Sequence, residues 1–183
     1  MQSPPNVAFS PLTTERLSLR QLKTEDAVAL SQLRSSEEVN KYIDRAKQTT
    51  IEEAVAFVNK INKSVSNRES FYWAINLKGE TDLIGTICLW NFNDEKSRVE
   101  VGFELHPSYQ GKGIMNEALS SVLQFSFDVL QLQAIDGFVH EENKASLNLL
   151  QRKGFILNPQ ISDPDSDKLI VYTITRENYQ SIF

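Results

Sequence analysis

The stretch Tyr109-Gln110-Gly111-Lys112-Gly113-Ile114-Met115 decides the expected fold, because its two glycines join the end of a strand to the start of a helix. Glycine lets the backbone turn tightly and approach a ligand closely. The N–H groups in the first turn of the helix lack intrahelical acceptors, and the helix dipole adds partial positive charge there. The stretch therefore predicts a turn that binds phosphate or pyrophosphate, with Lys112 at its rim. A tight turn without a ligand would carry the same glycines, so both interpretations stay open at this point.

Two other phosphate-binding motifs are excluded by the residues around these glycines. A P-loop needs Gly-Lys-Ser/Thr, whereas Lys112 is followed by Gly113 and Ile114. A dinucleotide-binding fingerprint needs a third glycine three residues further on, where Asn116 stands instead.

Three strand-like segments lead up to the turn. Residues 71–77 and 82–90 are joined by a short turn around Gly79, which is typical of a hairpin. Residues 98–105 alternate in polarity, and Pro107 ends this strand because proline cannot donate to a ladder. The apolar positions of the third segment are Val99, Val101, Phe103 and Leu105.

Helices and further strands surround these segments in the order expected of one domain. Apolar periodicity predicts helices over 25–34, 37–43, 50–65, 113–130 and 143–153, strands over 16–22, 134–139 and 168–174, and a short helix from Thr175. We expect Thr24 to cap the first helix and Thr50 to open the third through a capping box with Glu53. Residues 1–14 read as an extended lead-in, and no repeat or linker divides residues 1–183. The chain is therefore expected to be a single α/β (α+β) domain, with a mixed, mostly antiparallel, twisted sheet flanked by helices on both faces.

Charge and composition exclude several classes of function. The chain has 19 basic and 24 acidic side chains, a net charge of −5, which argues against a general nucleic-acid or anionic-membrane binder because phosphate contacts need a cationic surface. Cys88 is the only cysteine and lies in an apolar run, so we expect a packing residue rather than a nucleophile. No apolar stretch approaches the roughly 18–20 residues of a membrane span, and the start has no signal-peptide pattern. The chain is expected to be cytoplasmic and to lack a metal site, since its two histidines are far apart in sequence.

Two motifs, in the order found here, resemble those of the GNAT superfamily, the acetyl-CoA-dependent N-acetyltransferases. The sequence 110–115 is similar to the family's motif A, Arg/Gln-x-x-Gly-x-Gly/Ala, after a strand that ends in His-Pro. Asn143-Lys144-Ala145-Ser146, together with Lys153-Gly154-Phe155, resembles motif B. The opening Thr14-Glu15-Arg16-Leu17-Ser18-Leu19-Arg20 resembles the branch that contains the ribosomal-protein alanine and serine N-acetyltransferases. The resemblance covers about residues 12–175.

The resemblance implies a GNAT-like domain that transfers an acetyl group from acetyl-CoA, its co-substrate, to a primary amine by direct attack in a ternary complex. The acceptor would be the N-terminal α-amine of a protein, a ribosomal protein included, or a small-molecule amine, and homodimers are common in the family. The main chain of 103–105 would pair with the pantetheine arm, and Asn143 and Ser146 would lie by the thioester and the sulfur. The implied cofactor-binding residues are Phe103, Glu104, Leu105, Gln110, Gly111, Lys112, Gly113, Ile114, Met115, Asn143 and Ser146.

Two carboxylates before the turn are candidates for the general base, which must take a proton from the acceptor's ammonium group. Glu100 and Glu104 share one face of their strand by alternation, opposite its apolar residues. A bulge would change this parity, and either side chain could instead face solvent or pair with Lys or Arg. His140, which ends a strand just before Asn143, is a further acid/base candidate.

One departure from the family pattern bears on catalysis. Many GNAT enzymes use a tyrosine as general acid where this chain has Leu150, which cannot donate a proton. Ser146 is the nearest substitute in motif B, although its hydroxyl could instead bond the backbone in the first helical turn. Met115 stands where many members have Gly or Ala, and it is familiar in this branch. Because the tyrosine is missing, a non-catalytic acyl-CoA-binding or regulatory module is the alternative function.

Overall fold

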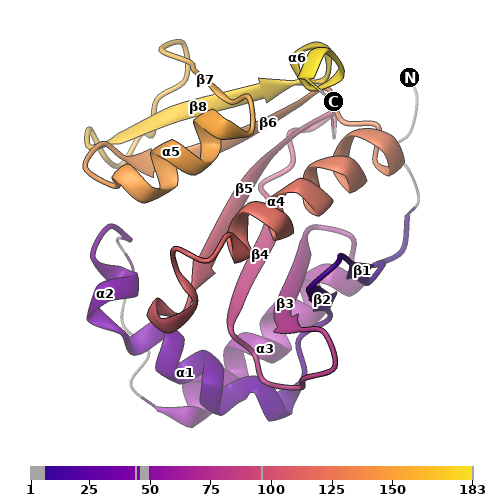
Figure 1. The fold of residues 1–183 in the computed structure, drawn as a ribbon, viewed down its shortest axis with the longest axis vertical. Helices are drawn as coiled ribbons and strands as arrows, with labels where there is room; N and C mark the ends of the chain where they lie inside the picture. The colour runs from indigo at the N-terminus through magenta and orange to yellow at the C-terminus, as the bar shows by residue number, and fades with distance from the viewer. Residues whose placement is uncertain (1–6, 44, 46–49, 96, 183) are drawn as a thin grey trace.

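Eight strands form one sheet in the order β1-β2-β3-β4-β5-β6-β8-β7 in the computed structural model, which describes residues 7–43, 45, 50–95 and 97–182 (Figure 1). The strands are β1 (Leu12–Thr13), β2 (Leu17–Arg20), β3 (Phe71–Leu77), β4 (Gly85–Trp90), β5 (Arg98–Leu105), β6 (Ala134–His140), β7 (Ile156–Leu157) and β8 (Leu169–Thr175). Neighbouring strands run antiparallel except β5 and β6, which run parallel. The expectation of a single mixed, mostly antiparallel sheet is confirmed.

Helices cover both faces of this sheet, as expected. They are α1 (Ala27–Ser35), α2 (Glu37–Asn40), α3 (Ile51–Ser66), α4 (Ile114–Gln124), α5 (Lys144–Arg152) and α6 (Arg176–Ile182). The larger core joins one sheet face to α4 and α5 and contains Trp73 and Leu119, and in Figure 1 α4 crosses in front of the strands. A smaller core joins the other face to α1 and α3 and contains Leu30 and Tyr72. Because Tyr72 and Trp73 are successive residues of β3, this strand is buried on both sides.

The long helix expected over 113–130 is shorter than predicted. It ends as an α-helix at Gln124 and continues as a π-helical turn over Phe125–Val129. The Ser126 hydroxyl donates to the Val122 carbonyl at 2.7 Å, and such bonding back into the helix often bends it. The Leu130 N–H donates to the Phe125 carbonyl, five residues earlier, which is the π-helical pattern.

Of the two predicted helix caps, the one at the start of α3 is confirmed and the one at the start of α1 is not. Thr50 accepts from the Glu53 N–H and the Glu53 carboxylate accepts from the Thr50 N–H, both at 3.1 Å, so the capping box is confirmed. Thr24 does not cap α1, and that prediction is wrong. A 3-10 turn over Thr24–Asp26 precedes α1, and the Asp26 carboxylate accepts from the Lys23 N–H at 2.8 Å.

The two parallel strands separate after a short paired stretch. β5 and β6 pair only from Arg98 to Glu100 against Ala134 to Asp136. Beyond that point β5 continues against β4, while β6 continues against β8. Figure 1 shows the resulting division, with β6, β8 and α5 leading away from β4 and β5. One edge of β5 is therefore left unpaired over its second half.

Replacing Gly85 by alanine should destabilise the fold. Gly85 lies opposite Leu105, and a Cβ there would come within 2.6 Å of the Glu104 carbonyl oxygen and 2.8 Å of Leu105 Cδ1. We expect a loss of about 1–3 kcal/mol, the usual cost of overpacking, measured as the free energy of unfolding in denaturant. Gly102→Ala is the matched control, because its nearest neighbour is the Cys88 Sγ at 3.2 Å and not backbone. Equal losses of unfolding free energy in the two variants would contradict the explanation that the backbone contact at Gly85 causes the destabilisation.

Candidate active site

The unpaired edge of β5 offers main-chain groups to an extended ligand. The His106 N–H donates to the Ile84 carbonyl at 2.8 Å, so even-numbered residues of β5 direct their main-chain groups at β4. Phe103 and Leu105 therefore direct theirs to the opposite edge, from which β6 has separated. The Leu105 carbonyl accepts from Gln110 Nε2 at 3.0 Å, and the described residues supply no partner for the main chain of Phe103. An extended molecule can pair with such an edge as an added strand does.

The turn that follows β5 has the conformation expected of an anion-binding turn. Gly111 and Gly113 have φ of 71° and 75°, in the left-handed region that glycine tolerates, and Gly113 is the N-cap of α4. Within the described part of the chain, the N–H groups of residues 111–115 make no close hydrogen bond to a backbone carbonyl. These donors at a helix N-terminus suit a phosphate group. Ile114 and Met115 direct their side chains into the larger core, which anchors the turn.

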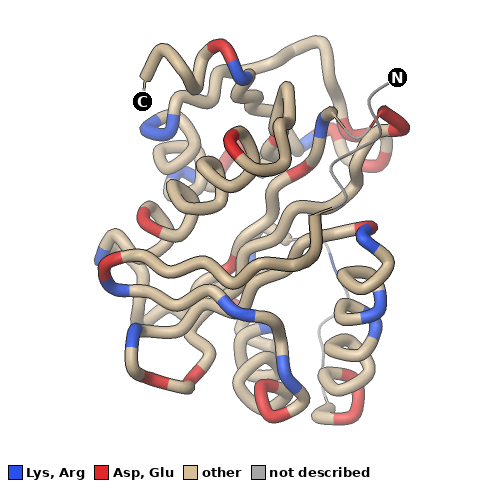
Figure 2. Tube along the Cα trace, turned by 90° about the vertical axis from the view of Figure 1, so that its right-hand side faces the viewer, with Lys and Arg blue, Asp and Glu red and all other residues tan. Residues whose placement is uncertain are grey.

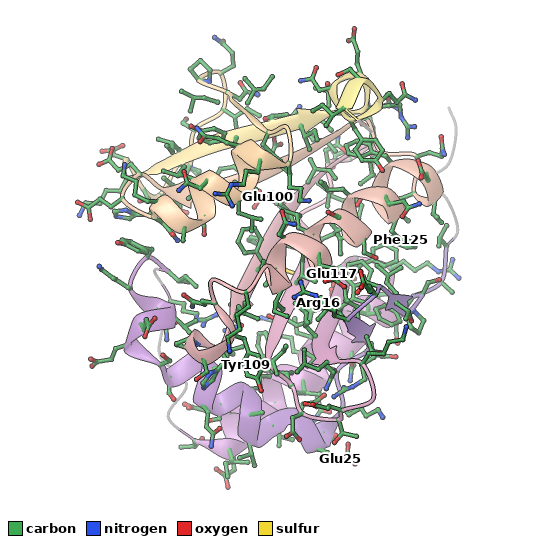
Figure 3. The ribbon with its side chains drawn as sticks, viewed as in Figure 1. Arg16, Glu25, Glu100, Tyr109, Glu117 and Phe125 are labelled. Atoms are coloured by element: carbon green, nitrogen blue, oxygen red, sulfur yellow. The ribbon has the colours of Figure 1, made fainter. Side chains whose placement is uncertain are left out.

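Arg16 supports this turn from β2's N-terminal side and was not singled out from the sequence. Its Nη1 donates to the Lys112 carbonyl at 3.0 Å, and its Nε pairs with the Glu117 carboxylate at 2.6 Å. Figure 3 shows Arg16 and Glu117 side by side next to α4. Although burial acts to raise the pKa of Glu117, hydrogen bonds from Thr14 and from Arg16 outweigh it and lower the pKa. Arg16 lies about a hundred positions before the turn, so only its place in the opening motif could have pointed to it.

We expect Arg16→Gln to weaken acetyl-CoA binding by about tenfold. The Arg16 Nη2 lies 3.4 Å from the position a Cβ of Gly113 would take, beside the unpaired amides, where a phosphate would gain a charge-assisted bond. Such bonds are worth about 1.5–3 kcal/mol, and the half-exposed side chain favours the lower end. Calorimetry measures the change. Lys78→Gln is the control, since Lys78 is also a cation and its Nζ donates to the Thr14 carbonyl at 3.3 Å and not to the turn. Equal weakening in both variants would point to general charge and not to a phosphate contact.

The motif B residues lie at the start of α5. The Asn143 Oδ1 accepts from the Ser146 N–H at 3.1 Å and caps the helix, which leaves the amide Nδ2 for another partner. The described residues give the Ser146 hydroxyl no hydrogen-bond partner, and the side chain is half-buried. Leu150 is fully buried and packs against Gly137 of β6, where a Cβ would come within 2.8 Å of Leu150 Cδ1. Leu150 therefore serves packing, at the position where the resemblance implied a tyrosine in many GNAT enzymes.

The β4–β5 register confirms that Glu100 and Glu104 share one face of the sheet, because it runs from Gly85–Leu105 to Trp90–Glu100 without a bulge. Glu100 lies at the last paired position before β5 and β6 separate, and its Oε1 accepts from Asn91 Nδ2 at 2.5 Å. Burial raises the pKa of Glu100, the bond from Asn91 opposes the rise, and nearby aspartates add to it. This carboxyl can hold a proton at a higher pH than an ordinary glutamate.

Glu104 is buried in a different environment. Its Oε2 pairs with Arg45 Nη2 at 2.6 Å, and its Oε1 lies 3.5 Å from Arg34 Nη1 and 3.3 Å from the Thr86 hydroxyl. Both carboxylate oxygens are thus engaged by guanidinium groups, which is the pairing that the sequence left as an alternative. Neither arginine was singled out from the sequence, because both lie far from β5 along the chain.

The two histidines make local hydrogen bonds. His106 Nδ1 accepts from the Ser108 N–H, and His140 Nδ1 accepts from the Glu142 N–H, both at 3.2 Å. The His140 ring also lies 5.3 Å from the ring of Tyr42, measured between centroids.

Among the described residues, no three His, Cys, Asp or Glu side chains are grouped so as to hold a metal ion. None of the described helices is both long and apolar enough to cross a bilayer.

Comparisons with known proteins agree with this geometry. The family described as Acetyltransferase (GNAT) domain matches residues 16–156. The chain is 31% identical to the uncharacterized N-acetyltransferase YoaA of Bacillus subtilis (strain 168), covering 80% of this chain and 83% of that protein. It is 34% identical to the uncharacterized N-acetyltransferase p20 of Bacillus licheniformis, covering 79% and 81%.

Solved structures share the fold. A GNAT-family acetyltransferase from Bacillus anthracis superposes with a TM-score of 0.77 at 25% identity, covering 92% of this chain and 99% of that one. RimL, a ribosomal L7/L12 α-N-protein acetyltransferase solved with coenzyme A, superposes with a TM-score of 0.79 at 18% identity, covering 91% and 98%. None of these matches supports a non-catalytic module. With the unpaired β5 edge, the amide-lined turn and the family match in agreement, this chain belongs to the GNAT family of enzymes, which transfer an acetyl group from acetyl-CoA to an amine.

Proposed function

We propose that this enzyme acetylates a primary amine by direct attack on acetyl-CoA, with the cofactor lying along the β5 edge and its pyrophosphate in the turn 110–115. The observation that carries the proposal is the separation of β5 from β6 after Glu100, which leaves the edge at Phe103 and Leu105 leading directly into the turn. Asn143 and Ser146, at the start of α5, offer an amide Nδ2 and a hydroxyl to the thioester end.

Proton transfer is assigned to Glu100 in this proposal. Acetyl-CoA supplies a thioester carbonyl, and the amine must lose a proton before it attacks that carbon. Glu100 has one hydrogen-bonded oxygen, half-burial and a raised pKa, which fit a general base acting directly or through water. Main-chain N–H groups near Leu105 can stabilise negative charge on the carbonyl oxygen.

The sulfur needs a proton as the C–S bond breaks, and in this proposal Ser146 donates it and takes in its place the second proton that the attacking nitrogen loses. The Ser146 hydroxyl has no hydrogen-bond partner among the described residues. Leu150 is a buried apolar side chain and has no proton to donate. Glu104 is assigned a positioning role, because two arginines hold its carboxylate. The three predicted catalytic residues thus have different roles in this proposal: Glu104 holds neighbouring arginines, Glu100 accepts a proton, and Ser146 donates one.

The acceptor class is tested with a panel of amines and thiol detection. Relatives differ in what their names state: one, at 24% identity, is the spermidine N(1)-acetyltransferase of Escherichia coli (strain K12), while RimL is named for a ribosomal protein. The panel therefore includes polyamines, peptides with free α-amines, amino acids and amino alcohols. We expect amine-dependent release of coenzyme A, together with an acetylated product seen by mass spectrometry. Cofactor binding without release for any amine would overturn the proposal. The homodimer implied by the resemblance and the cytoplasmic location expected from the sequence pattern stay predictions.

A further inference from the structure

Two guanidinium groups converge on one buried carboxylate beside the proposed site. Arg34, from the last turn of α1, and Arg45, beyond α2, both pair with Glu104 of β5. The side chains of Arg34, Arg45 and Glu104 are 13%, 17% and 5% exposed, so solvent screens this cluster only in part. Arg45 is further fixed by a bond from its Nε to Asn40 Oδ1 at 2.7 Å.

Positive charge and donors are in excess in this cluster, which we name the Arg34–Arg45 pair. Among the described residues its two cations face one anion, Glu104. The Glu104 Oε1 also accepts from Thr86, so that oxygen already has two partners. The Nε of Arg34 is buried and has no hydrogen-bond acceptor among the described residues, while its guanidinium lies 4.0 Å from the centroid of the Phe57 ring. A buried cation without its full set of acceptors is costly, and an anionic ligand would supply them.

The Arg34–Arg45 pair contacts Glu104 on the sheet face that also carries Glu100. The opposite sheet face is filled by the larger core, in which Val101 and Leu105 pack under α4. Glu104, Gly102 and Glu100 share the other face, and Gly102 places no side chain between the two carboxylates. Residues in a strand are about 3.3 Å apart, so Glu100 and Glu104 are separated by about 13 Å along β5. An amine near Glu100 and an anionic group near the arginines fit within one molecule when an extended chain of roughly ten ångströms joins them.

We propose that the acceptor carries an anionic oxygen group, a carboxylate or a phosphate, joined to its primary amine by an extended chain, and that the Arg34–Arg45 pair binds this group while Glu104 holds both arginines in place. The proposal rests on the proposed acetyl transfer and names the substrate class for it. Guanidinium groups bind such anions through paired, charge-assisted hydrogen bonds. A polyamine would bring further cations against the arginines and is expected to be a poor acceptor.

The test compares matched acceptors that differ only in the anion. A long-chain ω-amino acid is assayed against its carboxamide, and an ω-aminoalkyl phosphate of similar length against its amino alcohol, each as kcat/KM from thiol release with saturating acetyl-CoA. We expect the wild-type enzyme to prefer the anionic member of at least one pair by about tenfold or more, the value of one net charge-assisted contact. The pair that shows the larger preference identifies carboxylate or phosphate as the group recognised.

Two variants assign the preference to the arginines. Arg34→Gln and Arg45→Gln should each reduce the ratio of anionic to neutral kcat/KM by about tenfold. Arg152→Gln, on the exposed side of α5, is the matched control and should keep the wild-type ratio. Acetyl-CoA affinity reports folding, and if Arg45→Gln unfolds, Arg34→Gln carries the test, because it leaves the Arg45–Glu104 pair intact.

The outcomes separate this inference from the proposed function. If no amine is acetylated, acetyl transfer itself fails. If amines are acetylated but the anionic members have no advantage, or the advantage survives in both arginine variants, the anion-binding inference alone is overturned. A loss of the advantage in the arginine variants, with the ratio retained in Arg152→Gln, supports it.

Discussion

Gly113→Val is expected to weaken acetyl-CoA binding by about thirtyfold or more. Gly113 has a φ of 75°, and left-handed backbone costs a residue with a Cβ roughly 1–2 kcal/mol, more when it is β-branched. The variant can relieve this strain by rotating the turn, which would aim the amides of 111–115 away from a common point. A loss of about 2 kcal/mol in binding corresponds to about thirtyfold in Kd. Calorimetry with acetyl-CoA measures the change.

Gly79→Val is the matched control for this experiment. Gly79 also has a left-handed backbone, with φ of 86°, and nothing lies within 4 Å of the position of its Cβ. It lies in the turn between β3 and β4, which holds none of the amides of residues 111–115, so the same kind of strain acts at another turn. We expect a similar loss of stability with an unchanged Kd. An unchanged Kd in Gly113→Val itself would exclude the turn as the pyrophosphate site.

The local parts of the site could be predicted from the sequence. The glycines of the turn 110–115 determine the backbone conformation at their own positions, and they lie in the left-handed region. Alternation along β5 placed Glu100 and Glu104 on one face, and the bulge that could have changed this is absent from the described β4–β5 ladder. The capping box at Thr50 depends on residues three apart. In each of these cases, the sequence pattern and the structure that it predicts involve the same few neighbouring residues.

The parts that depend on distant residues could not be predicted. The separation of β5 from β6 depends on how β6 pairs with β8, and no residue of β5 encodes that pairing. Arg16 reaches Lys112, and Arg45 reaches Glu104, through contacts that tertiary packing creates. The π-helical turn after Gln124 was likewise hidden, because its apolar residues keep an almost helical spacing. These contacts bring the two arginines to the turn and to Glu104, and local sequence patterns do not encode them.

Glu100→Gln is expected to lower kcat by about a hundredfold or more while leaving the Kd of acetyl-CoA unchanged. General-base catalysis contributes about 10²–10⁴ in rate, and glutamine keeps the size of the side chain without accepting a proton. Glutamine can still bond the Asn91 amide through its own carbonyl oxygen, so the surroundings should change little. Thiol-release kinetics and calorimetry measure the two quantities. A variant with wild-type kcat would show that another group, or the solvent, takes the proton.

The pH dependence gives a second, independent check on Glu100, through its neighbour Asn91. The active form of the base is the carboxylate, so kcat/KM should rise as pH increases through the pKa of Glu100, which burial raises above its usual range. The Asn91 bond favours the carboxylate and lowers that pKa. Asn91→Gly removes the bond without strain, since Asn91 has a φ of 53° that glycine also adopts. The acid limb of the profile should therefore move to higher pH in Asn91→Gly and vanish in Glu100→Gln. A limb that stays in place in Asn91→Gly would assign the titration to a different group.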